Sequence, residues 1–567
     1  MSKIVYICSR DGHSIPYRQK HIEYLSKMLT PDNISPKSPF VREGEGVLLA
    51  VFNPVDSLPV HNLSVCMGAL IGEGDDWWKP GAEAPDGSYA LLRGSDTALE
   101  LLSDVLGTRS LWYVQTERLF IASTSQRALV FLLGGYQRNR AVYPWMLSSG
   151  TLGPGLSWDA RIRFLGPDSR LFLDRSSWKT AVVGQPVNFS PRPLSDECHE
   201  EKLAKAVRDT FEHLHLNWEK SVLSLSGGLD SRGILLMLKD RPGIRTVTWG
   251  LGSALDDVKS DACVARSLAR FFDVNNVYYE TDISDEPMEI LFERFLVAGE
   301  GRTDRISGYM DGFKIWKELS EASIEFVIRG DEGFGCMEAK RPWEVYRNMK
   351  LSVMSDFVNL PAPLRAFGNG SQQRRSLFER RINESIEAWR DRLNHQFEFP
   401  VVFGALNDLK LPYVEVINPL VSRRIAEQVR ALPDHLRTNK KLFRKVVQSM
   451  SPPVEFARYP AIQSRQNILR TPHAVHAIVD RLERARSTDR VLPKECLDFA
   501  LTHIQSKNGE EAYPSSEAEK LIFRLKEKIK QISPMQIMDP NIFAFRAYII
   551  SRMTEMLTSD ARAIHET

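Results

Sequence analysis

The sequence predicts an α/β protein with two domains, a β-rich domain over residues 1–190 and a domain built on a parallel sheet over residues 195–567. Three observations lead to this prediction. Short apolar stretches separated by Gly, Pro, Asp and Asn fill the first part, strands and helices then alternate, and a helical pattern dominates beyond about residue 313. Because domains of about 150 residues are typical, 567 residues exceed what one compact core holds. Residues 475–567 are expected to form a helical extension.

The expected strands of the first domain are short and apolar, and residues that favour turns separate them. They lie at Lys3–Cys8, Gly46–Phe52, Ser88–Leu92, Leu111–Val114, Arg118–Ala122 and Arg170–Leu173. The polar, proline-bearing segment Gly184–Pro193 then favours a linker.

The second domain begins with a helix signal. Ser195 can cap a helix whose first turn carries Asp196 and Glu197, and an amphipathic pattern follows. The expected elements beyond it alternate in type: strands at Ser221–Leu225, Arg245–Trp249 and Val277–Glu280, and helices at Ser231–Leu238 and Asp257–Phe272. This alternation is typical of a parallel sheet covered by helices.

Composition and charge exclude several classes of protein. Hydrophobic residues make up 43% of the chain and charged residues 26%, which is typical of a globular protein rather than a disordered or collagen-like one. The 74 Lys and Arg and 72 Asp and Glu leave a formal charge of +2, which argues against a dedicated nucleic-acid binder. No apolar run reaches the roughly 20 residues that cross a bilayer, the N-terminus lacks the apolar region of a secretory signal, and the six cysteines form no CxxC pair. We therefore expect a cytoplasmic protein with reduced thiols, and neither a membrane nor a nucleic acid as its partner.

One stretch, Ser221–Arg232 (SVLSLSGGLDSR), carries most of the chemical information. An apolar strand runs into Ser-Gly-Gly, and Asp-Ser then opens a helix. Glycines let the backbone approach a ligand closely, and the N–H groups of the turn together with the helix dipole form a cradle suited to pyrophosphate. Ser226 and Ser231 can add hydroxyl donors, and Asp230 can hold a magnesium ion against the phosphates. The alternative interpretation is a glycine-rich turn that binds nothing.

The loop is not the GxxxxGK[ST] P-loop. It resembles the SGGxDS loop of enzymes that split ATP between its α and β phosphates, and within that group it is similar to the asparagine-synthetase family. Three later segments support this resemblance: Phe326–Gly335 is similar to the family's second phosphate and metal loop, Val414–Leu420 resembles VEVRxPFLD, and Lys440–Val446 resembles the helix that follows it.

The first domain resembles the glutaminase domain of the same family, which has an Ntn-hydrolase fold. The segments that carry this likeness occur in the family's order: Asp86–Ala90, Asp104–Gly107, Leu111–Tyr113, Phe120–Ser123 and Leu165–Pro167. The resemblance covers roughly residues 1–470, and the helical tail after about residue 475 is predicted from its pattern alone.

The resemblance implies an ATP-pyrophosphatase domain with ATP and Mg²⁺ as cofactors, and it implies Asp230 and Asp331 as the magnesium ligands. The residues that it places around ATP are Leu223, Ser224, Ser226, Gly227, Gly228, Leu229, Asp230, Ser231, Trp249, Gly250 and Gly330. Two carboxylates from neighbouring strand ends can share a metal that screens the phosphates while a substrate carboxylate attacks the α-phosphorus. This attack gives an acyl-adenylate and pyrophosphate, and an amine then displaces AMP to leave an amide.

The first domain departs from the family at its glutaminase positions. Ser2 stands where glutamine-hydrolysing members have a Cys directly after the initiator Met, although a hydroxyl nucleophile is chemically possible. Cys66–Glu73 replaces the NGEIYN motif, and Gly46–Phe52 fills the region of the RLSI-type strand without an arginine. Cys8 lies inside an apolar strand, which favours a buried core thiol. We interpret this domain as a degenerate, retained scaffold without glutaminase activity.

The second domain departs from the family near the phosphates. Ile328 and Arg329 stand where asparagine synthetases have Glu-Gly, so that a carboxylate that handles the incoming amine is replaced and a cation is added. Ala461 replaces the lysine that stabilises the adenylate, and either Arg458 or Arg465 can supply the missing charge.

Two further cations, Arg302 and Arg305, precede the expected substrate loop. The residues expected to take part in catalysis are Arg329, Arg458, Lys441 and Arg305. For each of these arginines the alternative is a paired position at the surface.

The leading hypothesis is an ATP-dependent, AMP-forming carbon–nitrogen ligase whose substrate supplies its own amine, because the glutaminase machinery is degenerate. This pattern resembles the lasso-peptide cyclases and the β-lactam synthetases, and we expect macrolactam formation in a peptide, a reaction of natural-product biosynthesis. The expected partners are a peptide or small molecule with a carboxylate and an amine, and a peptidase or precursor-peptide-binding protein. The alternatives are glutamine- or ammonia-dependent amidation or β-lactam-type ring closure of a small acid, and a non-catalytic scaffold.

Overall fold

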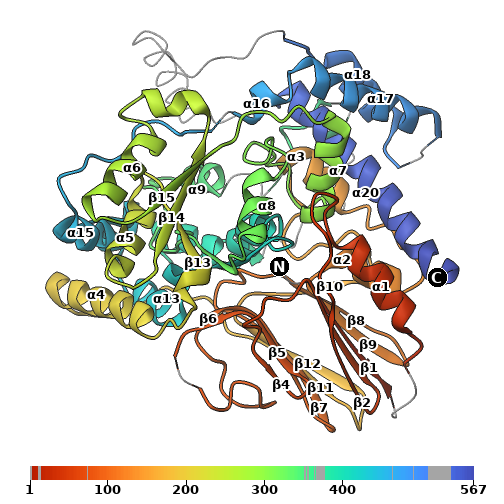
Figure 1. The fold of residues 1–567 in the computed structure, drawn as a ribbon, viewed down its shortest axis with the longest axis horizontal. Coiled ribbons are helices and arrows are strands. Elements are labelled where there is room, and N and C mark those ends of the chain that lie inside the picture. The colour runs from red at the N-terminus through yellow and green to blue at the C-terminus, as the bar shows by residue number, and fades with distance from the viewer. Residues whose placement is uncertain are drawn as a thin grey trace.

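The computed structural model describes residues 3–10, 15–72, 74–349, 357–362, 364–365, 377–462, 464–488, 491–507 and 538–567, together with Val353 and Ser355. The N-terminal strands form the lower part of the molecule in Figure 1, and the parallel strands with their helices lie above them. Among the described helices, none combines the length and the apolarity that crossing a membrane requires.

The described N-terminal part contains two antiparallel sheets of six strands each. The first has the order β10-β8-β9-β1-β3-β2, with β10 (Arg163–Leu165), β8 (Leu111–Gln115), β9 (Leu119–Ser123), β1 (Lys3–Ser9), β3 (Val47–Phe52) and β2 (Phe40–Gly44). The second has the order β12-β11-β7-β6-β5-β4, with β12 (Lys179–Gly184), β11 (Ser169–Asp174), β7 (Ala98–Ser103), β6 (Gly87–Gly94), β5 (Ser64–Leu70) and β4 (Val60–His61). Alternate side chains of both sheets meet in one apolar core that includes Tyr6, Leu49, Leu92 and Leu101.

The C-terminal part contains a five-stranded parallel sheet with the order β15-β14-β13-β16-β17. Its strands are β13 (Ser221–Ser224), β14 (Arg245–Gly250), β15 (Asn276–Glu280), β16 (Phe326–Ile328) and β17 (Glu415–Ile417). Along the sheet, β15, β14 and β13 follow one another on one side, and β16 and β17 lie on the other side of β13. The strand order therefore reverses between β13 and β16, which is where ligands bind in open α/β sheets.

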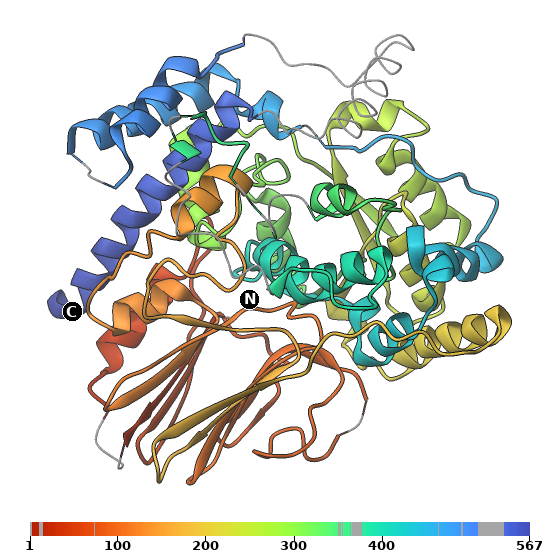
Figure 2. The same ribbon diagram turned by 180° about the vertical axis from the view of Figure 1, so that it is seen from behind.

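Helices cover both parts of the molecule (Figures 1 and 2). In the first part they are α1 (Gln19–Met28), α2 (Gln126–Leu132) and α3 (Val142–Ser149). In the second part the longer ones are α4 (Asp196–Glu212), α5 (Leu229–Leu238), α6 (Asp261–Phe271), α7 (Met288–Gly299), α8 (Lys314–Glu321), α9 (Pro342–Asn348), α11 (Ile386–Leu393), α13 (Arg423–Arg430), α15 (Lys441–Met450), α17 (Pro472–Thr488), α18 (Lys494–His503) and α20 (Pro540–Glu566). The π-helix Asn394–Phe403 follows α11 directly, and the shorter helices are α12 (Gly404–Asp408), α14 (Asp434–Arg437) and α16 (Arg465–Ile468).

The last helix, α20, joins the two parts of the molecule. It packs against α17 and α18 at one end and against α2 and α3 further along, and Figure 1 shows it running from the upper helices down beside α2. Its apolar side chains belong to the same buried core as those of β1, α2, α3 and α7. The described part of the helical extension therefore completes a core that is shared with the first domain.

The predicted fold class is confirmed, because antiparallel sheets precede a parallel sheet with helices and a helical extension follows. The predicted strands coincide with β1, β3, β6, β8, β9, β11 and β13–β15 to within about two residues. Ser195 caps α4 as expected, since its side chain accepts a hydrogen bond from the Cys198 N–H. The helices α1–α3 in the first domain were not expected, and the domain limits at 190 and 195 stay a prediction.

We predict that the buried ion pair between α2 and α20 stabilises the shared core. Arg127 donates to Asp560 from Nε (2.8 Å) and Nη2 (2.9 Å), and both side chains are less than one-tenth exposed. Asp560→Ala should lower the melting temperature by the equivalent of about 3–5 kcal/mol, because it leaves the Arg127 charge buried without its partner. Thermal unfolding followed by tryptophan fluorescence measures the effect.

The matched control is Asp480→Ala, which removes the partner of Arg484 on the exposed face of α17. This change should cost no more than about 0.5 kcal/mol. Equal melting shifts for the two variants would contradict the role assigned to the Arg127–Asp560 pair.

Candidate functional site

The candidate site lies where the strand order reverses, between the carboxyl ends of β13 and β16. The loop Leu225–Gly228 leaves β13 and leads into α5, while the loop that follows β16 begins at Arg329. Since neighbouring parallel strands end at the same edge of the sheet, the two loops predicted to hold phosphates lie side by side.

Two glycines let these loops approach each other and their surroundings. A Cβ on Gly227 would lie 2.5 Å from the Ala457 Cβ and 2.8 Å from the Val264 Cβ, so no side chain fits there. A Cβ on Gly330 would lie 3.0 Å from the backbone nitrogen of Ser231, in the other loop. Glycine is therefore needed at both positions for close packing rather than for an unusual φ angle.

Hydrogen bonds fix the first loop and leave the start of α5 open. The Ser231 Oγ accepts from the Ser226 N–H (3.0 Å), and the Asp261 carboxylate accepts from the Gly227 N–H (3.0 Å). Gly228 is the N-cap of α5 and has no side chain to cap the helix. The N–H groups of the first helical turn are thus available for an anion, at the positive end of the helix dipole.

Charged side chains of both loops meet around one ammonium group. The Lys440 Nζ lies 2.9 Å from Asp230 Oδ2 and 2.5 Å from Glu332 Oε1. The Arg329 Nε lies 3.3 Å from Asp331 Oδ2. Two cations thus face three carboxylates at the edge where both loops end.

Burial and mutual repulsion shape the titration of this cluster. Burial together with the nearby Asp230 raises the pKa of Glu332 to about 7, although Lys440 opposes the rise. Burial also raises the pKa of Asp230, Lys440 opposes this, and Asp331 adds to it. Lys440 remains charged because its two carboxylate partners outweigh the effect of burial on its pKa. The carboxylates are close enough to share a cation and depend on Lys440 for compensation.

The backbone before α15 is strained, and this strain directs Lys440 into the site. Asn439 (φ 58°) and Lys440 (φ 56°) both adopt the left-handed conformation, which costs on the order of 1–3 kcal/mol per residue for a side chain other than glycine. The Asn439 N–H donates to the Cys336 carbonyl (2.9 Å), and the Asn439 Oδ1 accepts from the Glu338 N–H (3.1 Å). The second loop therefore holds this turn in place.

The predicted adenine side lies next to the same loops. Leu223 has registered partners in both β14 and β16, whereas Ser224 has one in β14 alone, so Ser224 is nearer the open edge. Trp249, the second-last residue of β14, is half-buried and contacts Trp316 edge to face, with 5.5 Å between the ring centres. A Cβ on Gly250 would lie 2.4 Å from the Ala461 Cβ.

Ala461 itself is buried in an apolar cluster with Leu251, Ala254 and Ala262. A small residue is therefore required where the resemblance places a lysine. Of the two arginines considered as substitutes, Arg458 is exposed and pairs with Glu455 (3.2 Å), and Arg465 pairs with the buried Asp304.

The other predicted catalytic residues lie in three different places. Arg329 lies in the charged cluster. Lys441 is the first residue of α15 and is exposed, and its neighbour Lys440 contacts the carboxylates instead. Arg305 is half-buried beside Asp304, outside this cluster. Ser2 lies outside the described residues, and Cys8 is fully buried as expected.

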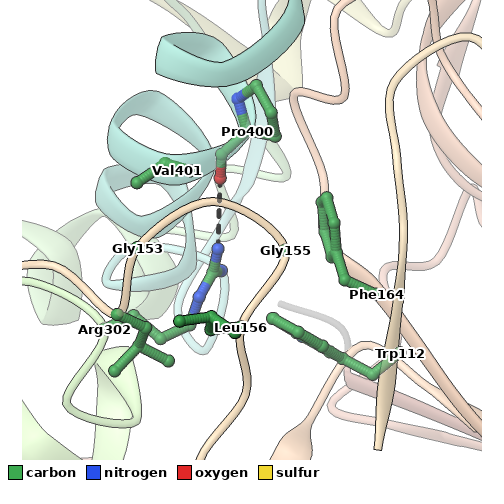
Figure 3. A pocket seen from close by; sticks show the side chains of 9 residues that line it. Trp112, Gly153, Gly155, Leu156, Phe164, Arg302, Pro400 and Val401 are labelled. Carbon is green, nitrogen blue, oxygen red and sulfur yellow. Dashed lines mark hydrogen bonds between the residues drawn. The ribbon is translucent and has the colours of Figure 1, made fainter. Parts of the chain in front are cut away.

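Arg302 lines a separate cavity between the two parts of the molecule, drawn in Figure 3. The cavity is walled mainly by Trp112, Leu156, Phe164, Pro400 and Val401. The Arg302 guanidinium is fully engaged there: it contacts Asp408, Ser110 (2.6 Å) and the Pro400 carbonyl (3.2 Å, the dashed line in Figure 3). This side chain therefore supports the junction of the two parts and is not free to bind a phosphate.

The donor set of the cluster fits a magnesium ion that arrives with phosphates. Mg²⁺ prefers oxygen ligands and is usually held by one or two carboxylates together with substrate phosphates. Asp230 and Asp331 supply two such carboxylates beside the open start of α5. In the described part of the chain, no three His, Cys, Asp or Glu side chains are grouped to hold a metal alone. The residues thus suit a metal shared with phosphates rather than a metal held by protein ligands alone.

Sequence reasoning missed three residues that shape this site. Lys440 was noticed only as part of a helix motif, and the signal that separates it from Lys441 is the left-handed turn at Asn439, which a sequence does not display. The carboxylate of Asp261, the first residue of α6, accepts a hydrogen bond from the Gly227 N–H and so helps to fix the first loop. His395 supports the second loop through the Gly333 carbonyl, at 2.8 Å.

A doubly wound parallel sheet with a glycine loop, an open helix start and a carboxylate–ammonium cluster at its switch point defines a phosphate-binding α/β protein. The chain belongs to the asparagine synthase family, whose family model matches residues 201–498. This is a family of ATP-dependent ligases that form amides.

Two solved structures are similar to parts of this chain. One is described as the allosteric regulatory enzyme of purine biosynthesis, with 11% identity over 50% of this chain and 81% of that chain and a TM-score of 0.22. The other is glutamine phosphoribosylpyrophosphate amidotransferase from B. subtilis with ADP and GMP, with 10% identity over 58% and 90% of the chains and a TM-score of 0.21. At such scores these likenesses carry no argument about function. No curated protein matches the chain.

We predict that His395 makes stability depend on pH. Burial together with the nearby Arg430 lowers the pKa of His395 to about 3, so the folded protein keeps the ring neutral with Nε2 toward the Gly333 carbonyl. The unfolded chain takes up a proton below about pH 6.5, so stability is lost as the pH falls, by about 1.4 kcal/mol per unit. Melting temperatures of wild type and His395→Gln should therefore converge between pH 7.5 and 5.

His503→Gln, at the exposed end of α18, is the control and should show no such convergence. A gap between wild type and His395→Gln that stays constant with pH would contradict the neutral buried ring.

Proposed function

We propose that the second domain binds ATP with Mg²⁺ between the loop Ser226–Ser231 and Asp331, adenylates a substrate carboxylate and releases pyrophosphate. An amine then displaces AMP and an amide forms. The observation that carries this proposal is the Lys440 ammonium held between Asp230 and Glu332, beside the uncapped start of α5. That arrangement combines open N–H donors, a cation and metal-type carboxylates at one point.

The residues of the site divide the work by their chemistry. The first-turn N–H groups of α5 and the Ser226 hydroxyl can donate to phosphate oxygens. Lys440 and Arg329 can neutralise the charge that grows on the departing pyrophosphate. Mg²⁺, held by Asp230 and Asp331, would polarise the phosphoryl oxygens. Trp249, which the resemblance places near adenine, packs edge to face against Trp316.

We propose that the nitrogen comes from the substrate itself, so that a ring closes. Ile328, which replaces the carboxylate that handles ammonia in the resemblance, is fully buried in the core as the last residue of β16. The segment that replaces NGEIYN begins inside β5, where Cys66 and Met67 are buried in the sheet. These positions support a reaction that needs neither ammonia handling nor glutamine.

The substrate we propose is a peptide whose side-chain carboxylate is captured by its own N-terminal amine, as in a lasso-type macrolactam. Such a peptide would come from a precursor, and a peptidase that exposes the amine is the partner this reaction requires. The helical extension does not support this choice, because the described part of it packs into the shared core. A small acid that closes a β-lactam ring is an outcome that the test below can distinguish.

We predict that Asp230→Asn lowers ATP-dependent pyrophosphate release by on the order of 100-fold, because it removes one carboxylate from the proposed metal. Lys440→Ala should act in the same direction. The controls are Asp240→Asn, just beyond α5, and Lys445→Ala, on the exposed face of α15, and both should stay within about twofold of wild type. Wild-type turnover of Asp230→Asn would contradict the assignment of the metal.

We also predict that a candidate core peptide incubated with enzyme, ATP and Mg²⁺ loses one water and becomes blocked at its N-terminus, as mass spectrometry would reveal. Glutamine should release no glutamate, and Ser2→Ala should react like wild type. A product in which ammonia replaces the hydroxyl, or glutamine-dependent activity that Ser2→Ala abolishes, would favour amidation instead. ATP binding without pyrophosphate release would favour a non-catalytic scaffold.

A further inference from the structure

Both carboxylates assigned to the magnesium ion are already partnered by a cation of the protein itself. The Lys440 Nζ lies 3.1 Å from Asp230 Oδ1 and 2.9 Å from Asp230 Oδ2, so the ammonium group contacts both oxygens of that carboxylate. The Arg329 Nε lies 3.3 Å from Asp331 Oδ2. A metal that binds these two carboxylates therefore has to compete with two positive side chains.

The two ion pairs are neighbours because the loops that carry them touch. A Cβ on Gly330 would lie 3.1 Å from the Asp230 Cβ, and Gly330 directly precedes Asp331. The Lys440 Nζ also lies 2.5 Å from Glu332 Oε1, in the same loop as Asp331. One ammonium group and one guanidinium group thus face three carboxylates at this edge of the sheet.

The charge of this cluster decides which form of a metal it accepts. Three ionised carboxylates and two cations leave one negative charge. A divalent cation that arrived alone would make the cluster positive and would lie beside two groups of like charge, which is unfavourable. A nucleotide polyphosphate brings several negative charges together with its metal. The cluster therefore favours a metal that arrives with phosphates.

Lys440 can leave Asp230 without a change in its backbone. Both side chains are 26% exposed, so neither is sealed in the core. The turn at Asn439 is held by the Cys336 carbonyl and the Glu338 N–H, whereas the four-carbon stem of a lysine is flexible. The ammonium group can thus turn from the carboxylates to phosphate oxygens while the strained turn stays in place.

Arg329 adds a second cation that the family pattern does not contain. It stands where the asparagine synthetases that this chain resembles have a glycine, which offers no side chain to pair with Asp331. The Arg329 N–H donates to the Ile417 carbonyl at 2.9 Å, so the backbone is fixed at the end of β16. Its side chain is 22% exposed and lies at the same edge as Lys440.

We propose that Lys440 and Arg329 are internal counter-cations that keep a free divalent cation off Asp230 and Asp331, so that the site accepts the metal as its complex with a polyphosphate. Both side chains turn to the phosphates when that complex binds, and the two carboxylates become available as ligands. The identity of the polyphosphate as ATP rests on the proposed function.

The test measures the affinity of the full-length protein for Mn²⁺, which takes oxygen ligands as Mg²⁺ does, by isothermal titration calorimetry without nucleotide. Lys440→Met should tighten Mn²⁺ binding by about tenfold, because a competing cation is removed, and Arg329→Gln should act in the same direction through Asp331. Lys440→Arg keeps the charge and should bind Mn²⁺ like wild type. The control is Lys445→Met, which removes the exposed partner of Glu200 on α15 and should change nothing.

The second measurement uses the Mg²⁺ complex of α,β-methylene-ATP, which cannot be split between its α and β phosphates. Lys440→Met and Arg329→Gln should bind this complex about tenfold more weakly, because each loses a cation that serves the phosphates. Opposite changes in the two affinities are the signature of the proposal, since a side chain that only supports the fold would weaken both. Adding Asp230→Asn to Lys440→Met should remove the gain in Mn²⁺ affinity.

Unchanged or weaker Mn²⁺ binding by Lys440→Met, or a gain that survives Asp230→Asn, would overturn the proposal. An unchanged Mn²⁺ affinity of Arg329→Gln would overturn the part assigned to Arg329. Melting temperatures show whether Lys440→Met is folded, and Arg329→Gln decides the matter if it is not. Because the Mn²⁺ titrations need neither nucleotide nor turnover, they fail independently of the pyrophosphate-release assay that tests the proposed function.

Discussion

Lys440 contacts carboxylates of both loops that are predicted to hold phosphates, and the candidate site depends on this one interaction. Asp230 follows β13 and Glu332 follows β16, so the strand order brings like charges together at the edge of the sheet. Without a cation between them, burial and repulsion would drive these groups to bind protons instead. The protein maintains a strained left-handed turn at Asn439 and Lys440 to place that cation. Strain of this kind persists where the surrounding structure fixes it, and here the second loop does so.

The two parts of the molecule are joined by buried charge as well as by apolar packing. Arg127 and Asp560 link α2 to α20, and Asp304 links the segment after α7 to α16 and α20. Arg109, from the first part, reaches Glu415 at the start of β17. Such pairs are costly unless both members are present, which makes the geometry of the junction specific. The sandwich of antiparallel sheets is therefore a structural support for the part of the chain that carries the parallel sheet.

The features that the sequence predicts well are local. Strand and helix limits follow from apolar periodicity and caps, as at Ser195, whose side chain bonds the Cys198 N–H. The SGGLDS loop could be recognised because close packing against the side chains of Ala457 and Val264 demands glycine at Gly227. The short helices α2 and α3 were not predicted from the sequence. Nearly all of their residues are buried, so these helices lack the polar face that marks a helix in a sequence.

The sequence by itself determined the alternation of strands and helices, the glycine loop and the carboxylates Asp230 and Asp331, because each depends on neighbours within a few residues. Only the tertiary structure decided that Lys440 rather than Lys441 enters the site, since a backbone turn fixed by Cys336 and Glu338 sets the direction of that side chain. The tertiary structure also decided which partners the arginines have. Arg302 is engaged at the domain junction and Arg458 pairs at the surface, whereas the guanidinium of Arg305, next to Asp304, forms no ion pair with any described residue. The charge of an arginine is given by the sequence, but the partner of Arg302 lies 106 positions further along the chain, and only folding brings the two side chains together.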